Sequence, residues 1–320
     1  MSSFLYFVLP ALGGYTLTSL YLLKNPHILH RRKRTGFYCT HISHRGGCGE
    51  RIESTMEAFT HALEQGTEMF ELDCHLTHDG HVVVSHDENL LRQTGHDVTV
   101  SSLNLQDLPL YKEQLEVTFY AGHYSSGADR QFTLLEEVFK KFPRVPVSIE
   151  LKENNHGLIQ KVSDLVKKYH REEITVWASV NSSIMKECHR TNASMPYSFT
   201  VRRGVLLLLL FYSGLLPFVP LGESLLQFYL PRIFNRCGCV PVCPCISVLS
   251  SLCRVTMRRS LFKHLADRGI QVHLFVCNED EDIKAAFDVG ATGVMTDYPT
   301  VLSRFLCQNQ SQDCGQTALQ

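Results

Sequence analysis

The sequence predicts a parallel α/β fold, and a closed (β/α)₈ TIM barrel in particular, from three observations. Short β-rich runs recur along the chain, helical patterns stand between most of them, and several helices end where a glycine follows. Alternating strands and helices are typical of parallel sheets, and eight strands over about 250 residues suit a closed barrel. An open doubly wound sheet is the structural alternative, although no G-x-G-x-x-G motif opens a predicted helix.

We assign the predicted barrel to residues 40–307. Its eight candidate strands cover 40–44, 69–76, 81–86, 145–151, 174–179, 196–201, 271–277 and 293–297. The helical patterns cover 53–65, 133–142, 157–170, 182–191, 258–268 and 280–289. Residues 308–320 are polar, and we expect a disordered tail there.

Composition excludes several classes of protein. Hydrophobic residues make up 44% of the chain and charged residues 20%, which favours a sizeable core over global disorder. Lys and Arg total 31 against 32 Asp and Glu, and this balance argues against a nucleic-acid partner. The 12 cysteines show no disulfide framework, so we expect mostly reduced thiols. The spacing in the cluster Cys237–Cys253 is not that of the usual zinc pairs, which leaves ordinary or palmitoylated thiols.

The first segment predicts a transmembrane anchor over residues 1–24. Residues 4–23 carry no charge, and about 20 apolar residues span a bilayer as a helix. The basic cluster at residues 31–34 follows, so we expect the rest of the chain in the cytoplasm, on the endoplasmic reticulum or another internal membrane. A cleaved signal peptide is the alternative. It is disfavoured because the basic cluster follows the apolar run and no A-x-A-like site precedes residue 24.

A second apolar run covers residues 204–222, where Pro217 and Pro220 would kink or end a helix. The run falls between the predicted sixth and seventh strands, and a single crossing there would split the closed barrel across the membrane. We therefore predict a hydrophobic insertion at 204–236 that contacts the membrane as a re-entrant or interfacial segment. A buried helix of an enlarged loop is the alternative.

Titratable side chains gather at the carboxyl ends of the predicted strands. They are His44, Arg45, Glu71, Asp73, His86, Glu150 and Lys152. Strand ends of a parallel barrel meet at one rim, where active sites are built. Neighbouring carboxylates repel one another unless a cation lies between them, and oxygen ligands select Mg²⁺ or Ca²⁺. Histidines suit acid and base roles and arginine suits a phosphate, so this rim predicts metal-assisted cleavage of a phosphorylated substrate.

Six short motifs in this order resemble the glycerophosphodiester phosphodiesterase domain. They are His44-Arg45-Gly46, Glu53-Ser54-Thr55, Glu71-Leu72-Asp73, His86-Asp87, Glu150-Leu151-Lys152 and the run from Gly293 to Pro299. The anchor, the apolar insertion and the chain length resemble the membrane-anchored branch, which acts as a lysophospholipase D. The resemblance implies hydrolysis of lysophosphatidylcholine, lysophosphatidylethanolamine or glycerophospho-N-acylethanolamine lipids. The products would be lysophosphatidic acid and the head-group alcohol or N-acylethanolamine.

The resemblance also implies a role for each rim residue. It makes Glu71, Asp73 and Glu150 the divalent-metal ligands, makes His44 and His86 the acid/base pair with His86 also near the metal, and places Arg45 and Lys152 at the phosphate. The sequence departs from the family pattern twice. Ser54 stands where the family has Asn, and the family's Trp-Thr-x-Asn motif is Phe275-Val276-Cys277-Asn278 here.

Other functions remain open at this point. A catalytically silent, membrane-anchored barrel would bind lipid without turnover, and a glycerophosphodiesterase would act on deacylated substrates. A phospholipase C-like barrel shares two histidines and a metal but usually brings accessory domains. The intact histidines and carboxylates favour the enzyme, with a lysophospholipid and a membrane as partners.

Overall fold

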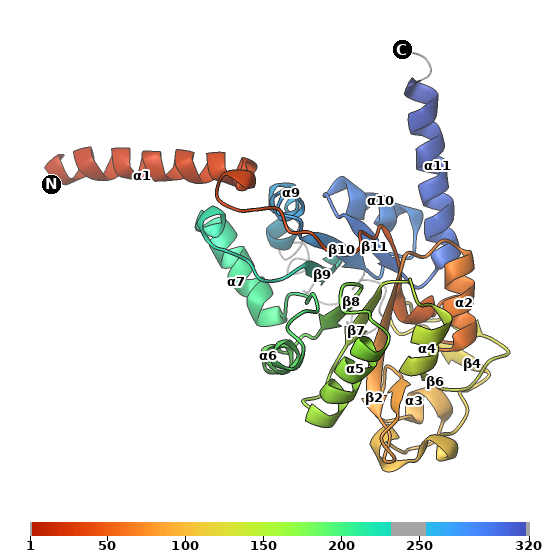
Figure 1. The fold of residues 1–320 in the computed structure, drawn as a ribbon. Coiled ribbons are helices and arrows are strands. Elements are labelled where there is room, and N and C mark those ends of the chain that lie inside the picture. Colours follow the sequence, from red (N-terminus) through yellow and green to blue (C-terminus); the bar gives the residue numbers. More distant parts are fainter. Residues whose placement is uncertain (1, 232–253, 318–320) are drawn as a thin grey trace.

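The computed structural model describes residues 2–231 and 254–317, and a parallel barrel forms its centre (Figure 1). The barrel strands are β1 (His41–Ser43), β2 (Met69–Leu76), β7 (Val147–Glu150), β8 (Thr175–Ala178), β9 (Leu225–Tyr229), β10 (Gln271–Phe275) and β11 (Gly293–Thr296). They pair in parallel in the order β9-β10-β11-β1-β2-β7-β8. The predicted fold class is confirmed.

A short segment closes the gap between β8 and β9. Tyr197 forms a parallel bridge with Trp177, and Ser198 forms one with Leu225. The Ser198 backbone N–H donates to the Trp177 carbonyl at 2.9 Å, and Phe199 donates to Leu225 at 2.9 Å. Residues 197 and 198 therefore take the place of a fifth barrel strand, and eight parallel segments complete the ring.

The strand predictions need two corrections, because one predicted strand lies outside the parallel barrel and one barrel strand was missed. The predicted strand at 81–86 is β3 (Val82–Val84), which runs antiparallel to β2 and pairs with β6 (Thr133–Leu134) outside the parallel barrel. It belongs to an insertion that also holds β4 (Gln114–Glu116) and β5 (Tyr124–Ser126). In contrast, β9 was not predicted. The apolar run at 204–222 therefore lies between the fifth and sixth parallel segments, not between the sixth and seventh.

Helices cover the outside of the barrel. They are α2 (Met56–Glu64), α4 (Leu135–Lys141), α5 (His156–Lys168), α6 (Ser182–Thr191), α7 (Val201–Tyr212), α9 (Arg259–Asp267), α10 (Asp280–Asp288) and α11 (Pro299–Thr317), with α3 (Leu91–Thr94) in the insertion. Thr55, Asn155 and Asn181 cap the first turns of α2, α5 and α6 with their side-chain oxygens. The expected disordered tail is instead helical through Thr317, because extending an existing helix needs no new nucleus.

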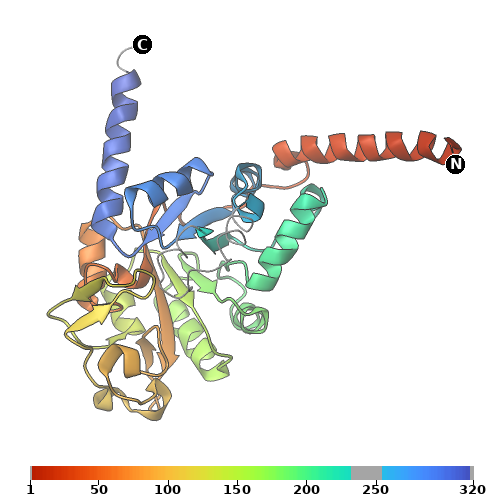
Figure 2. The ribbon, with the colours of Figure 1, turned by 180° about the vertical axis from the view of Figure 1, so that it is seen from behind.

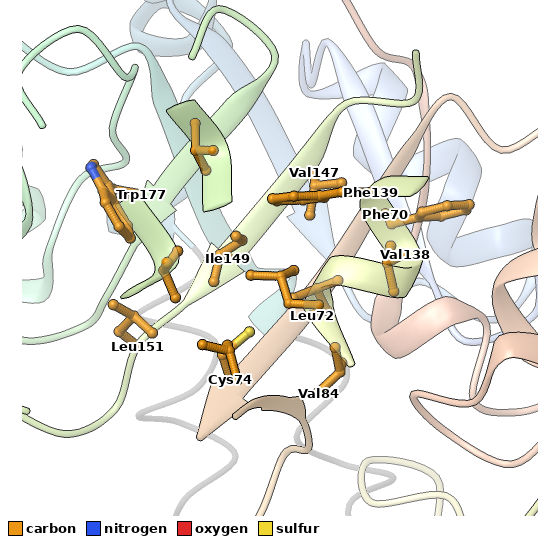
Figure 3. Close-up of a cluster of buried hydrophobic side chains, with 14 of the residues drawn as sticks. Phe70, Leu72, Cys74, Val84, Val138, Phe139, Val147, Ile149, Leu151 and Trp177 are labelled. Atoms are coloured by element: carbon orange, nitrogen blue, oxygen red, sulfur yellow. The ribbon is translucent and has the colours of Figure 1, made fainter. Parts of the chain in front are cut away.

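Strand alternation separates the core from the site. Phe70, Leu72 and Cys74 of β2 point outward and are buried in a cluster with α4, α5 and Trp177 (Figure 3). Burying a large apolar side chain stabilises the fold by roughly 1.5–3 kcal/mol. Trp177 is fully buried in this outer core, so it does not line the barrel mouth. The intervening residues of β2, Glu71 and Asp73, point into the barrel.

The first helix, α1 (Ser2–Lys24), projects away from the barrel (Figures 1 and 2). Among the described residues, Tyr6–Lys24 is the stretch that is long and apolar enough to cross a membrane, and only 11% of it is buried. The second apolar run begins within α7 and continues past it through the 3₁₀ turn η5 (Leu216–Phe218). The 12 residues of α7 extend about 18 Å and fall short of a bilayer core of about 30 Å. The cysteine cluster Cys237–Cys253 lies outside the described residues.

Candidate active site

A tight turn carries the first site residues out of β1. The 3₁₀ turn η2 (His44–Gly46) follows directly. Arg45 within this turn has φ 48°, and Gly47, the first residue after the turn, has φ 86°. A side chain at Gly47 would approach the Pro299 ring to 2.6 Å, so only glycine fits there. A left-handed arginine is uncommon, and such strain is typical of functional sites. The turn places His44 at the barrel mouth.

A buried carboxylate holds the His44 ring. His44 Nδ1 lies 2.6 Å from Asp297 Oδ1, so the Nδ1–H donates to Asp297 and Nε2 stays on the side of Glu71, 3.9 Å away. Asn278 Nδ2 donates to the other Asp297 oxygen at 2.7 Å, and the Cys48 thiol donates to Oδ1 at 2.9 Å. Burial lowers the pKa of His44, but the charge and hydrogen bond of Asp297 together with the Glu71 charge outweigh burial and raise that pKa overall.

Three carboxylates face one another inside the mouth. Asp73 of β2 and Glu150 of β7 are register partners, and Glu71 lies two residues before Asp73 on the same strand face. One oxygen from each of the three lies within 4.8 Å of the others. Burial and the Asp73 charge raise the pKa of Glu150 to about 7, and the same two causes raise the pKa of Glu71. The site therefore concentrates negative charge that the protein only partly neutralises.

This carboxylate set fits a divalent cation. Three converging carboxylate oxygens are the hard ligands that Mg²⁺ and Ca²⁺ prefer, and the raised pKa values report a repulsion that a cation would relieve. The described residues contain two further candidate groups, His44 with Cys48 and Asp297, and His75 with Glu88 and Glu153. In both of these a histidine and a carboxylate already pair with each other.

His86 and Lys152 complete the rim from two different elements. His86 arrives from the insertion after β3 instead of a barrel strand, and its Nδ1 lies 2.5 Å from Asp87 Oδ1. Lys152 follows β7; its Nζ lies 2.8 Å from Asp73 Oδ1 and donates to the His86 carbonyl at 3.3 Å. Burial lowers the pKa of His86 and outweighs the opposing hydrogen bond to Asp87. The two histidines therefore have pKa values shifted in opposite directions.

Arg45 is buried beside the site and already paired. Its guanidinium donates to Glu53 Oε2 at 3.2 Å and to the Thr118 hydroxyl at 3.0 Å, while Nε has no hydrogen-bond partner among the described residues. Glu53 also accepts from Arg92 and Gln93. Burial raises the pKa of Glu53, but the charges of Arg45 and Arg92 together with the Arg92 hydrogen bond outweigh burial and lower that pKa to about 2. In this geometry, part of the Arg45 guanidinium is engaged in holding the insertion.

His75 lies in a second ion-pair cluster. Its Nδ1 is 3.1 Å from oxygens of both Glu88 and Glu153. Despite burial, these carboxylates raise the pKa of His75 to about 9, so the ring is a cation between two anions. Glu88 lies two residues after His86, and Glu153 lies directly after Lys152, so this cluster supports both rim segments.

The barrel mouth contains a cavity that three of these side chains line. His44, Glu71 and Glu150 form its polar side, and Phe199 and Phe275 form part of an apolar side. Phe275 lies 4.1 Å from Tyr229 between ring centroids, and Tyr229 lies 5.6 Å from Phe119. At the barrel mouth, charged side chains therefore lie next to an aromatic wall made of Phe275, Tyr229 and Phe119.

The fold thus brings together all seven residues predicted from the sequence. They are His44, Arg45, Glu71, Asp73, His86, Glu150 and Lys152. The sequence analysis did not find the partners that hold them. These partners are Asp297, Cys48 and Asn278, and none of them was assigned a role from the sequence. The signal available was that Asn278 and Asp297 both belong to family motifs.

Comparison with known proteins decides the family. The family model described as the glycerophosphoryl diester phosphodiesterase family matches residues 44–301. The chain belongs to this family. Human lysophospholipase D GDPD3 is 49% identical over 96% of this chain and 97% of its own length. Human lysophospholipase D GDPD1 is 49% identical over 94% of this chain and 96% of its own length.

The fold agrees with solved members of the glycerophosphoryl diester phosphodiesterase family. The crystal structure of the glycerophosphodiester phosphodiesterase from Thermotoga maritima has a TM-score of 0.57 at 20% identity and covers 84% of this chain and 98% of that one. At this identity the likeness supports the fold alone. The chain is therefore a phosphodiesterase-family enzyme on a TIM barrel, and the family assignment predicted from the motifs is confirmed.

Proposed function

We propose that the chain is a divalent-metal-dependent lysophospholipase D, which hydrolyses the phosphodiester of a lysophospholipid to lysophosphatidic acid and the head-group alcohol. One observation carries the proposal: the buried carboxylates of Glu71 and Asp73 and the partly buried carboxylate of Glu150 converge at a barrel mouth between two histidines. The names of the two human relatives, each about half identical over nearly the whole chain, support the lysolipid substrate. The aromatic wall beside the carboxylates suits an acyl chain.

The proposed chemistry divides between the two histidines. Asp297 stabilises a protonated His44, which suits the general acid that protonates the leaving alcohol. His86, with its lowered pKa, suits the general base that removes a proton from the nucleophile, either water or a substrate hydroxyl. Arg45 and Lys152 neutralise charge on the phosphoryl oxygens. A divalent ion held by Glu71, Asp73 and Glu150, with His86 nearby, would add Lewis-acid charge; Mg²⁺ or Ca²⁺ both suit these ligands.

We also propose the placement of the chain on a membrane. Residues 1–24 anchor the barrel of residues 40–307, and α7 contributes an interfacial contact within the insertion at 204–236. Exposed Val201, Val205 and Leu209 on one side of α7 support this contact. The basic residues 31–34 favour a cytoplasmic barrel. The endoplasmic reticulum or another internal membrane stays a prediction.

Product analysis tests the proposed function. The purified full chain is incubated with lysophosphatidylcholine and Mg²⁺ or Ca²⁺, and free choline and phosphocholine are both measured. Free choline is expected, and H44A and H86A should each reduce the rate by on the order of 10²–10⁴. Phosphocholine would identify a phospholipase C instead. Lipid binding without either product would identify a silent barrel, and exclusive turnover of glycerophosphocholine would identify a deacylated substrate.

A further inference from the structure

A groove separate from the barrel mouth lies between α1, α7 and α9. No residue that lines the mouth cavity also lines this groove. Its apolar wall includes Leu20 and Leu23 of α1, Phe211 of α7 and Pro217. Its basic border consists of Lys24 at the end of α1, Arg258 before α9 and Lys263 within α9. Among the described residues that line the groove, none is acidic.

Specific hydrogen bonds fix the walls of this groove. The Tyr15 hydroxyl donates to the Ser213 carbonyl at 2.6 Å, and the Ser19 hydroxyl donates to the Gly214 carbonyl at 2.6 Å. On the other side, His264 Nδ1 lies 2.8 Å from the Leu23 carbonyl. These contacts hold α1 against the segment that follows α7 and against α9, so the groove is a defined part of the fold.

The polarity of the groove changes along its length. From Tyr15 to Lys24, α1 extends about 14 Å and is largely apolar until Lys24. Lys263 precedes His264, which contacts Leu23, so a second cation lies near the end of α1. Lys24 and Arg258 form no ion pair within the described residues, whereas Lys263 pairs with Asp267 at 2.9 Å. An apolar trough that ends in cations is complementary to an anionic amphiphile.

We propose that this groove binds one anionic phospholipid of the membrane, with its phosphate group on Lys24, Arg258 and Lys263 and an acyl chain along α1 and α7. The inference rests on the proposed membrane location of α1 and not on the chemistry at the barrel mouth. The bound lipid fills the space between anchor and barrel and fixes the barrel against the bilayer. It is a structural ligand and is not turned over at this position.

Lipid binding to the full-length protein tests this inference. The delipidated protein in detergent is titrated with dioleoylphosphatidylglycerol or dioleoylphosphatidylcholine, and bound lipid is counted by native mass spectrometry. One tightly bound phosphatidylglycerol is expected. The triple variant K24Q/R258Q/K263Q should bind it on the order of tenfold more weakly, because its phosphate loses charge-assisted contacts. The control K112Q/K161Q/K167Q removes the same charge from exposed positions outside the groove and should bind like wild type.

Three results would overturn the inference. They are equal affinity for the neutral lipid, unchanged binding by the groove variant, or an equal loss in the control variant, which would indicate general electrostatic attraction. The charge-state distribution in the same spectra reports whether each variant is folded. Since the readout is bound lipid and not turnover, failure of the proposed enzymatic function leaves this result unaffected.

Discussion

At the scale of single residues, Asp297 is the side chain whose role is most clearly visible in the structure and least visible in the sequence. It is fully buried, and Asn278 and Cys48 both donate to it while it accepts from His44. We expect D297N to lower kcat by on the order of 10- to 10³-fold, because His44 loses the carboxylate that orients its ring and stabilises its charge. Steady-state kinetics with lysophosphatidylcholine measures this effect.

A double-mutant cycle separates this role from a general structural effect. If Asp297 acts through His44, D297N should have almost no further effect in the H44A background. Multiplicative losses in the double variant would contradict the assignment of Asp297 as the positioning residue.

The burial of His273 predicts that the stability of the protein depends on pH. It lies on β10, fully buried, and neither ring nitrogen has a hydrogen-bond partner among the described residues. Burial lowers its pKa from 6.5 to about 4. Between these values the unfolded chain binds the proton and the folded chain does not, so the stability contribution of neutral His273 is lost as pH falls through this range.

The variant H273L removes this titration. Its melting temperature relative to wild type should therefore rise as pH is lowered from 7 to 5, with a free-energy slope of up to about 1.4 kcal/mol per pH unit. Thermal unfolding in detergent at a series of pH values measures the difference. A difference that does not change with pH would show that His273 does not resist protonation in the folded protein.

At the scale of elements, the insertion between β2 and β7 depends on Glu53. This buried carboxylate joins Arg45 of the first turn to Arg92 and Gln93 of the insertion. We expect E53Q to destabilise the protein by on the order of 3–5 kcal/mol, because Arg45 would remain buried without its counter-charge. The control R51Q breaks the partly exposed Arg51–Glu57 pair, at 3.3 Å, and should cost less than about 1 kcal/mol. Chemical denaturation compares the two, and equal effects would contradict a special role for Glu53.

The elements also show what could be predicted from the sequence. Alternation along β2 places Glu71 and Asp73 on the face opposite Phe70 and Leu72, and the sequence suffices for this because the side-chain period depends only on the backbone of one strand. Strand partners depend on the whole barrel. The valine-rich run of β3 has strand propensity but pairs in an antiparallel hairpin, and propensity contains no information on a partner.

Because strand pairing cannot be predicted from propensity, the sequence analysis also missed the side chains that hold the site residues. The Asp297 carboxylate lies 253 residues from His44 along the chain, and it reaches His44 only because β11 pairs with β1. In contrast, His44, His86 and the three carboxylates could be found because their residue types and order suit one reaction. Motifs identify the reacting groups, whereas the groups that orient them depend on tertiary contacts.

At the scale of the whole molecule, the proposed orientation puts the barrel on the cytoplasmic side of a membrane that α1 spans. Protease added to sealed microsomes should therefore degrade the barrel without detergent, because residues 31–34 favour the cytoplasmic side. Immunodetection of a tag at the C-terminus reports the result. Protection of the whole barrel until detergent is added would place it in the lumen and contradict the proposed orientation.

We expect Glu71, Asp73 and Glu150 to share one divalent ion at the barrel mouth. A crystal structure of the protein soaked in Mn²⁺, as an anomalous substitute for Mg²⁺, tests it most directly. One strong anomalous peak is expected at roughly 2.0–2.6 Å from a carboxylate oxygen of each residue, and E150Q should lose that peak. A mouth without a peak, or a peak confined to His75, Glu88 and Glu153, would contradict the claim.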